Sequence, residues 1–162
     1  MIITFGKYYG RSVEWLIVED PAYVDWLLGC PSPRGRMRLV CDEARRLIAS
    51  FDSKPILVQC EGKDCNALAT RLIMCCGVTR PTYLCLTCNP RNPMLPSSLA
   101  DIRTYQEAIQ FIKAVWFGKK GAMRELIGLM VKAKNPTQRA HEERSEMSYH
   151  RWIHQDRSDP WW

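Results

Sequence analysis

The fold of this chain is decided by two short stretches, Cys60-Glu-Gly-Lys-Asp-Cys65 and, after a further nineteen residues, Cys85-Leu-Thr-Cys88. Two close cysteine pairs at this separation have the spacing of a zinc site, because zinc accepts four thiolates tetrahedrally from two hairpin-like knuckles. Turn-forming residues stand where the knuckles need them, with Gly62 inside the first pair and Pro90 just after the second. We therefore predict one zinc ion bound by Cys60, Cys65, Cys85 and Cys88.

The predicted site is closed, since four sulfur ligands leave no coordination position for a water molecule. Closed zinc sites are structural rather than catalytic, so the ion would stabilise a fold and would perform no chemistry. Two alternatives stay open: the four residues can be buried free thiols, and Cys75 or Cys76 can replace a ligand of the first pair. Cys30 and Cys41 have no paired neighbour and are interpreted as packing residues.

The composition is that of a globular protein with a moderate positive charge. The 162 residues are 46% hydrophobic and 25% charged, which suits one ordinary domain or two small ones and not a disordered chain. The net charge of +6 permits an acidic partner such as nucleic acid without requiring one. The N-terminus lacks the pattern of a signal peptide, and no apolar run reaches the ~18 residues of a membrane helix. We expect a cytoplasmic protein without a membrane association, in which paired cysteines indicate metal rather than disulfide.

We predict an α+β fold in four parts. A small N-terminal α/β unit spans residues 1–51, and a four-cysteine zinc module with short strands spans residues 55–96. A helical hairpin spans residues 97–134, and a polar tail, either helical or partly disordered, spans residues 135–162.

Local signals place the elements of the N-terminal unit. Ile2, Ile3 and Phe5 can open the chain with a short strand. Ser12 and Asp20-Pro21 are predicted to cap two successive helices, because each offers a side-chain oxygen at a helix start and proline suits the first helical position.

Further signals extend the prediction along the chain. Apolar residues at helical spacing predict a helix over residues 37–51, and Ile56–Val58 is expected to form a strand leading into the first cysteine pair. In the hairpin, Ser97 or Ser98 is expected to cap the first helix, with Ile102 on its apolar face.

A family resemblance is carried by the strings Phe5-Gly6-Lys7-Tyr8-Tyr9-Gly10 and Tyr23-Val24-Asp25-Trp26-Leu27-Leu28, the second of which follows Asp20-Pro21. On these motifs, residues 3–50 resemble the C-terminal module of exodeoxyribonuclease X. Separately, the expected strands around the two cysteine pairs make residues 55–96 similar to a zinc ribbon. In the exonuclease, that module accompanies a separate catalytic domain with clustered acidic residues, and nothing in this chain matches the catalytic domain. The resemblance implies association with bacterial or phage nucleic-acid systems, without nuclease activity.

Three groups of residues are candidates for contact with nucleic acid. In the N-terminal turn, cations flank a tyrosine pair, and such groups can stack on bases and neutralise phosphates. An arginine cluster can line one face of the third helix, and two lysines lie in the turn of the hairpin. The plain alternatives are an inward-packed tyrosine with a solvated rim, ordinary surface charge, and a simple helix connection. The candidates are Lys7, Tyr8, Tyr9, Arg11, Arg34, Arg36, Arg38, Lys119 and Lys120.

The remaining signals concern partners. Trp161 and Trp162 are candidate partner-binding residues, because exposed aromatic side chains anchor protein interfaces. No nucleophile–base constellation and no phosphate-binding glycine loop stands out in the sequence. We expect a non-enzymatic, zinc-containing adaptor that binds nucleic acid or a nucleic-acid-processing complex. The alternatives are a protein-only interaction factor, such as an inhibitor or assembly subunit of a defence or mobile-element system, and a hydrolase built from dispersed acids.

Overall fold

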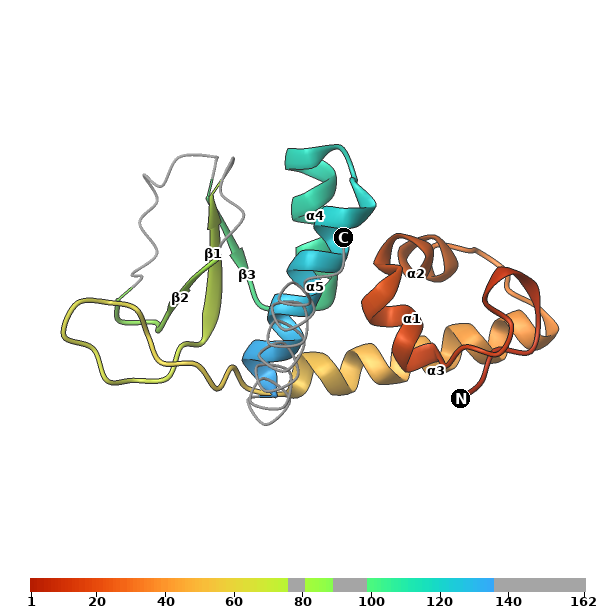
Figure 1. Cartoon of the computed structure of the whole chain (residues 1–162), viewed down its shortest axis with the longest axis horizontal. Coiled ribbons are helices and arrows are strands. Elements are labelled where there is room, and N and C mark those ends of the chain that lie inside the picture. Colours follow the sequence, from red (N-terminus) through yellow and green to blue (C-terminus); the bar gives the residue numbers. More distant parts are fainter. Residues whose placement is uncertain (76–80, 89–98, 136–162) are drawn as a thin grey trace, which may run out of the picture.

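The computed structural model describes residues 1–75, 81–88 and 99–135. In chain order, the elements are the 3-10 helix η1 (Gly6–Tyr8), α1 (Val13–Glu19), α2 (Pro21–Leu28), α3 (Gly35–Ser53), β1 (Arg71–Cys75), β2 (Thr82–Leu84), β3 (Leu99–Ile102), α4 (Tyr105–Trp116) and α5 (Lys120–Lys134). These five α-helices and one small sheet confirm the predicted α+β class for the described part of the chain. The sheet lies beside α4 and α5, on the side away from α1 and α2 (Figure 1).

The first two helices begin at the predicted caps. The Ser12 hydroxyl accepts a hydrogen bond from the Trp15 amide at 3.1 Å, and the Asp20 carboxylate accepts one from the Tyr23 amide at 3.0 Å. The expected opening strand is reduced to an isolated bridge between Ile2 and Ser12. The short N-terminal segment therefore folds back onto the start of α1 instead of joining a sheet.

The first helix of the hairpin begins later than predicted. Thr104 caps α4 in a capping box, because its hydroxyl accepts from the Glu107 amide while the Glu107 carboxylate accepts from the Thr104 amide. The prediction of Ser97 or Ser98 as the cap is wrong, since residues 99–102 form strand β3, and Ser97 and Ser98 themselves lie outside the described residues. Ile102, expected on the apolar face of the helix, is a buried residue of the sheet.

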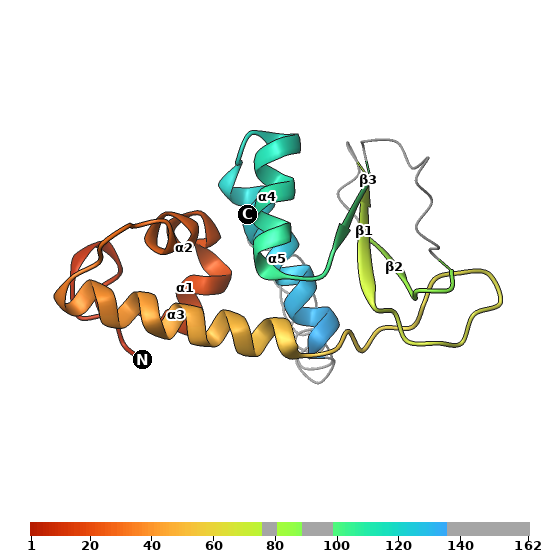
Figure 2. The ribbon, with the colours of Figure 1, turned by 180° about the vertical axis from the view of Figure 1, so that it is seen from behind.

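The N-terminal helices and the hairpin share one continuous apolar core. Its fully buried side chains come from all five α-helices and from the sheet, and they include Leu16, Leu27, Ala44, Leu72, Ile112 and Ile127. Figure 2 shows α3 running along one side of this helical body and reaching α5. No helix within the described residues is long and apolar enough to cross a membrane.

The sheet is antiparallel with the order β2-β1-β3, so β1 is its central strand. Leu72 of β1 pairs with Tyr83 of β2 on one side and with Ile102 of β3 on the other. Arg71, only 3% exposed, donates a hydrogen bond to the Asp101 carboxylate at 2.7 Å and thereby ties β1 to β3. The ion pair compensates the charge of Arg71 in a place where an unpaired charge would be costly, while the buried Arg71 Nε has no hydrogen-bond partner among the described residues.

The segment Ile56–Val58 forms no strand, so that prediction is wrong. Its backbone hydrogen bonds are divided: the Leu57 amide donates to the Ala133 carbonyl of α5, and the Val58 carbonyl accepts from the Ala69 amide, both at 2.8 Å. A strand needs a continuous ladder with one partner, whereas these bonds anchor the chain to the helical body before it reaches the cysteines.

Hydrogen bonds to both helices of the hairpin join it to the end of α3. The Asp52 carboxylate accepts a hydrogen bond from the Tyr105 amide at 2.8 Å, at the start of α4. The buried Lys134 ammonium, at the end of α5, donates to the Phe51 and Asp52 carbonyls at 3.0 and 3.3 Å. Each contact satisfies groups that a helix terminus leaves without an intrahelical partner. We call Asp52, Tyr105 and Lys134 the helix junction.

Candidate metal centre and aromatic face

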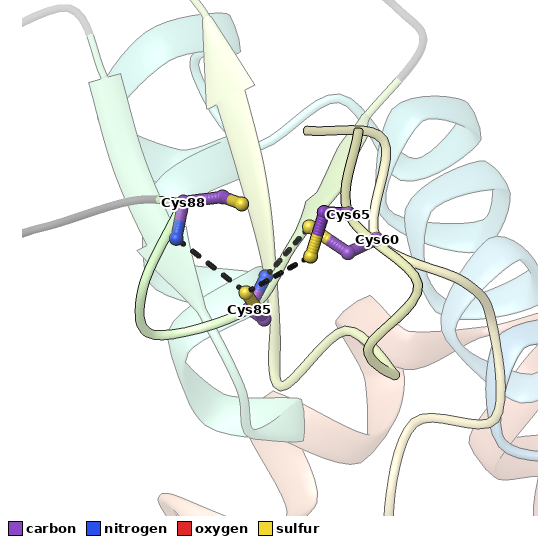
Figure 3. Close-up of side chains that lie close together, drawn as sticks. All are labelled: Cys60, Cys65, Cys85 and Cys88. Carbon is purple, nitrogen blue, oxygen red and sulfur yellow. Dashed lines mark hydrogen bonds between the residues drawn. The ribbon is translucent and has the colours of Figure 1, made fainter. Parts of the chain in front are cut away.

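The four predicted cysteine ligands converge from two loops. Cys60 and Cys65 lie between α3 and β1, and Cys85 and Cys88 follow β2, with their sulfur atoms facing one another (Figure 3). All four Sγ atoms lie within 4.8 Å of one another, and those of Cys65 and Cys85 are 3.8 Å apart. Sulfur atoms around a tetrahedral ion at about 2.3 Å are separated by about 3.8 Å. The site can therefore hold one metal ion with four sulfur ligands.

Backbone hydrogen bonds hold the first cysteine loop against the sheet. The Cys60 amide donates to the Ala67 carbonyl at 2.9 Å, and the Glu61 amide donates to the Tyr83 carbonyl of β2 at 2.8 Å. Between the cysteines the chain turns sharply, and Asp64 takes a left-handed conformation with φ of 57°. Aspartate is among the residues that tolerate this region, so the local sequence favours the turn that brings Cys60 and Cys65 together.

Backbone amides also point at the sulfur atoms. Cys60 Sγ accepts from the amides of Cys85 at 3.2 Å and Gly62 at 3.4 Å, and Cys85 Sγ accepts from the Cys88 amide at 3.4 Å. The Cys88 amide lowers the pKa of the Cys85 thiol, because a donor stabilises the thiolate. The neighbouring Cys65 sulfur, followed by those of Cys85 and Cys60, raises the pKa of Cys88. A bound divalent cation would offset this repulsion among the thiolates.

Gly62 leaves the space that the four sulfur atoms need. A Cβ atom at this position would lie 2.5 Å from Cys88 Sγ and 2.8 Å from Cys88 Cβ. Both distances are shorter than any ordinary contact, so a side chain at position 62 and the observed position of Cys88 exclude each other. The close approach of the backbone explains glycine here, beyond the general preference of turns for glycine.

The backbone of Cys75 and the side chain of Cys41 lie apart from this centre. Cys75 ends β1 four residues beyond Arg71, which pairs with the residue before Cys85, so its backbone is about 13 Å along the strand. Cys76 lies outside the described residues. Cys41 is buried, and its thiol donates to the Leu27 carbonyl at 3.5 Å, in agreement with a packing role.

A second candidate site is a row of aromatic rings on the N-terminal helices. The rings of Trp15 and Tyr8 have centroids 6.1 Å apart, those of Tyr8 and Tyr23 lie 4.8 Å apart edge to face, and those of Tyr23 and Trp26 lie 5.2 Å apart. We call Trp15, Tyr8, Tyr23 and Trp26 the aromatic row. Tyr8 is buried, while Trp26 at one end is 57% exposed. The row therefore presents its two tryptophans to solvent around a fixed centre.

Two cations lie over this row. The Arg11 guanidinium is 4.9 Å from the centre of the Trp15 ring, and the Lys7 ammonium is 4.8 Å from that of Tyr8. The Tyr8 hydroxyl accepts from Lys7 at 2.9 Å and donates to the Asp20 carboxylate. These contacts fix the orientation of Tyr8 and leave Arg11 and Lys7 at the solvent edge.

The Asp20 carboxylate brings two predicted groups of residues together. Burial works against its ionisation, yet the hydrogen bonds from Tyr8 and the Tyr23 amide and the charges of Lys120 and Lys7 hold the pKa of Asp20 below its usual value. Lys120, from the hairpin turn, therefore lies in the electrostatic neighbourhood of Lys7, from the N-terminal turn. The sequence alone gave no link between the two turns.

The arginine cluster at the start of α3 is exposed and close to the N-terminal turn. Arg36 donates to the Thr4 carbonyl at 3.5 Å, and Arg38 lies 3.7 Å from the Asp42 carboxylate in the next turn of the helix. Arg34 precedes the first residue of α3 and its side chain caps nothing. Lys119 precedes α5 and is exposed. Trp161 and Trp162 lie outside the described residues.

Sequence reasoning assigned Tyr8 and Tyr9 to the binding surface and missed the tryptophans of the aromatic row. Tyr9 is 74% exposed, whereas Tyr8 packs inward, as one of the stated alternatives has it. A signal for the row was available: Trp15 and Trp26 fall beside buried Leu16 and Leu27 on short helices, at positions that face away from the core. Large aromatic residues at such positions are candidates for contact with a ligand.

No family model, curated protein or solved structure matches this chain. The resemblance of residues 3–50 to the exodeoxyribonuclease X module therefore stays a prediction. The function is inferred below from the geometry of the metal centre and of the aromatic row.

Proposed function

We propose that this protein is a non-enzymatic adaptor whose fold is stabilised by a zinc ion, and that it binds nucleic acid or a nucleic-acid-processing complex through the aromatic row. The observation that carries the proposal is the combination of Trp15 and Trp26 with the cations Arg11 and Lys7 on one face. The resemblance of residues 3–50 to a nuclease-associated module points to the same partner class.

The physical basis is stacking combined with charge. Every base has an aromatic face, so exposed tryptophan rings can bind bases with little dependence on sequence, and nearby cations attract the phosphates. The guanidinium of Arg11 is held over Trp15, which positions a charge at the edge of a stacking surface. Lys120, whose charge acts on Asp20, and Arg36, which contacts the Thr4 carbonyl, add positive charge near the N-terminal turn.

Zinc has a structural role in this proposal. The sheet has three short strands, and small modules of fewer than about 40 residues usually need a metal or a disulfide for stability. Four cysteine sulfur atoms complete the tetrahedral coordination of zinc, so no position is left for an activated water molecule. The metal would fix the two loops against β2 and would hold the sheet beside the helical body.

A salt titration with charge-reversed variants tests the proposal. Binding of a fluorescent single-stranded oligonucleotide is followed by anisotropy from about 50 mM salt upward, for the wild type and for Lys7→Glu/Arg11→Glu. Two lost phosphate contacts should lower the slope of log K against log salt by about 1.4. The matched control, Lys54→Glu/Arg103→Glu, makes the same charge change at exposed positions away from the row and from the cysteine loops. A wild-type protein that binds no nucleic acid at about 50 mM salt would overturn the proposal.

A second candidate is a protein-only interaction factor. The exposure of Trp26 and Tyr9 favours it, because tryptophan and tyrosine are the residues that most often dominate protein interfaces. Under this alternative, Trp26→Ala abolishes capture of a partner from the native host, whereas Lys7→Glu/Arg11→Glu leaves capture unchanged. Equal loss in both variants, together with oligonucleotide binding, would favour the nucleic-acid proposal.

A further inference from the structure

Phe117 is exposed to a degree that its size does not explain. It is 93% exposed, more than any other large hydrophobic side chain in the described part of the chain, and it lies in the turn between α4 and α5. Its backbone is left-handed, with φ of 51° and ψ of 34°. A bulky residue in this region is a genuine outlier, because glycine or asparagine would fill the position at lower cost.

The turn itself does not need the phenyl ring. The amides of Phe117 and Gly118 both donate to the Ile112 carbonyl at the end of α4, so the turn is closed by backbone groups. Gly118 then takes a second left-handed conformation, with φ of 70°. A ring that is almost fully exposed contributes little to the core, so neither packing nor hydrogen bonding accounts for phenylalanine. Strain combined with exposure is typical of a residue that contacts a ligand.

The turn is anchored beside the aromatic row. The Lys113 ammonium, one helical turn before Phe117, pairs with the Asp25 carboxylate of α2 at 2.5 Å, and Asp25 is the neighbour of Trp26. Helix α2 contacts both α4 and α5, and both views show the α4–α5 turn on the side that faces α2 (Figures 1 and 2). The Lys113–Asp25 pair therefore ties α4, one helical turn before Phe117, to the helix that carries Trp26.

The residues after Phe117 carry positive charge. Lys119 and Lys120 are exposed, and the charge of Lys120 also acts on Asp20 beside the row. A protruding aromatic ring followed by two cations has the chemistry of a stacking platform with phosphate contacts. A duplex covers both faces of its internal bases and leaves an open base face only at its two ends, so a single protruding ring finds many more accessible bases on a single strand.

We propose that Phe117 stacks on an unpaired base of single-stranded nucleic acid, with Lys119 and Lys120 contacting the adjacent phosphates. This inference rests on the proposed function and narrows it, because it names single strands as the substrate class and extends the binding surface from the N-terminal helices to the hairpin turn. It also gives the strain of the turn a use, since the ring is held away from the core.

Binding and stability of Phe117 variants test this inference together. Anisotropy is measured on a labelled strand of about 16 nucleotides and on the same sequence as a blunt duplex, for the wild type, Phe117→Asn and Phe117→Trp. Base stacking on one ring is worth about 1–3 kcal/mol, so Phe117→Asn should weaken binding of the single strand by about 5- to 150-fold. Duplex binding should change less than twofold, and Phe117→Trp should retain the wild-type affinity.

Thermal unfolding of the same variants separates a binding role from a structural one. Asparagine suits the left-handed conformation, so Phe117→Asn should keep or raise the melting temperature while it loses binding. Leu68→Ala, at an exposed apolar position before β1, is the matched control and should alter neither measurement. A lower melting temperature for Phe117→Asn would show that the ring packs, and would overturn the inference.

The remaining outcomes distinguish this inference from the proposed function. If the wild type binds the single strand and Phe117→Asn binds it equally well, the inference fails and the adaptor proposal stands. Equal weakening on the single strand and on the duplex also overturns it, because stacking on unpaired bases predicts a difference. If the wild type binds neither oligonucleotide, both proposals fail together, and Phe117 is then better explained as an anchor for a protein partner.

Discussion

Replacing Gly62 with alanine should weaken metal binding while leaving the metal-free protein nearly unchanged. The new Cβ atom would lie 2.5 Å from Cys88 Sγ, roughly an ångström short of ordinary contact. Without metal, no ion ties the two loops together, so the Cys88 side chain can rotate and its backbone can shift away from the methyl group at a smaller cost. With metal, Cys88 is fixed as a ligand, so the strain falls on the loaded state alone.

The magnitude follows from the distances around Gly62. The methyl group would also lie 2.8 Å from Cys88 Cβ and 3.3 Å from Cys60 Sγ, so two of the four ligands must move. Disturbing the support of metal ligands typically costs 10- to 100-fold in affinity, which is about 1.4–2.8 kcal/mol. We expect Gly62→Ala to lower the zinc affinity at least tenfold.

The assay compares metal affinity with stability in the same protein. Zinc affinity is measured by competition with a chromophoric chelator, zinc content by elemental analysis, and unfolding by circular dichroism with and without metal. The control is Gly128→Ala in the middle of α5, where a Cβ atom would meet nothing within 4 Å. This control should keep the wild-type zinc affinity and gain about 0.5–1 kcal/mol of stability, because alanine is the better helix former. A Gly62→Ala protein with wild-type zinc affinity would refute the reasoning.

Three further predictions follow from the metal centre and the buried charges. Cys85→Ser should reduce the zinc content from one ion per chain to none in elemental analysis and lower the melting temperature; a wild type purified from zinc-containing medium without any metal would contradict the assignment. Burial raises the pKa of Asp52 above its ordinary 3.8, so the wild type should lose stability relative to Asp52→Asn as the pH rises from 3.8 through that raised pKa. Asparagine keeps an acceptor for the Tyr105 amide. Urea unfolding at about pH 3–7 measures the free energy of unfolding of both proteins, and a difference between them that does not change with pH would contradict the prediction. Asp101→Ala should lower the free energy of unfolding in urea by about 3 kcal/mol, because it leaves Arg71 buried without its partner. This is the low end of the roughly 3–5 kcal/mol that breaking a buried ion pair costs, and it applies because the Asp101 side chain is 28% exposed. A change below about 1 kcal/mol would contradict the prediction.

Features set by neighbouring residues could be predicted from the sequence. The caps at Ser12 and Asp20-Pro21 are local chemistry, and both helices begin where they indicate. The cysteine spacing likewise predicted a four-sulfur cluster, because ligand spacing within each pair constrains the loops strongly. Only the meeting of the two pairs depends on tertiary structure, and a bound ion would supply the reason for it.

Features set by distant residues could not be predicted in this way. Ile102 fits a helical apolar face as well as a buried strand, and only pairing with Leu72 of β1 decides for the strand. The segment Ile56–Val58 has strand-forming residues but finds its partners in α5 and before β1. The aromatic row gathers rings from η1, α1 and α2, and its gathering depends on how these short helices pack, which periodicity does not report.

The helix junction has a consequence for how the protein responds to metal removal. Asp52 near the end of α3 and Tyr105 at the start of α4 are in direct contact, although 52 positions lie between them in the chain. The segment between Asp52 and Tyr105, which carries the four cysteines, therefore leaves the helical body and returns to it at one point, as an inserted domain does. We expect that removal of the metal by a chelator unfolds this cysteine-bearing segment first while the helices stay folded, so thermal unfolding should show two transitions. A linker joining Lys54 to Thr104 directly should yield a folded helical protein that still carries Trp26 and Phe117.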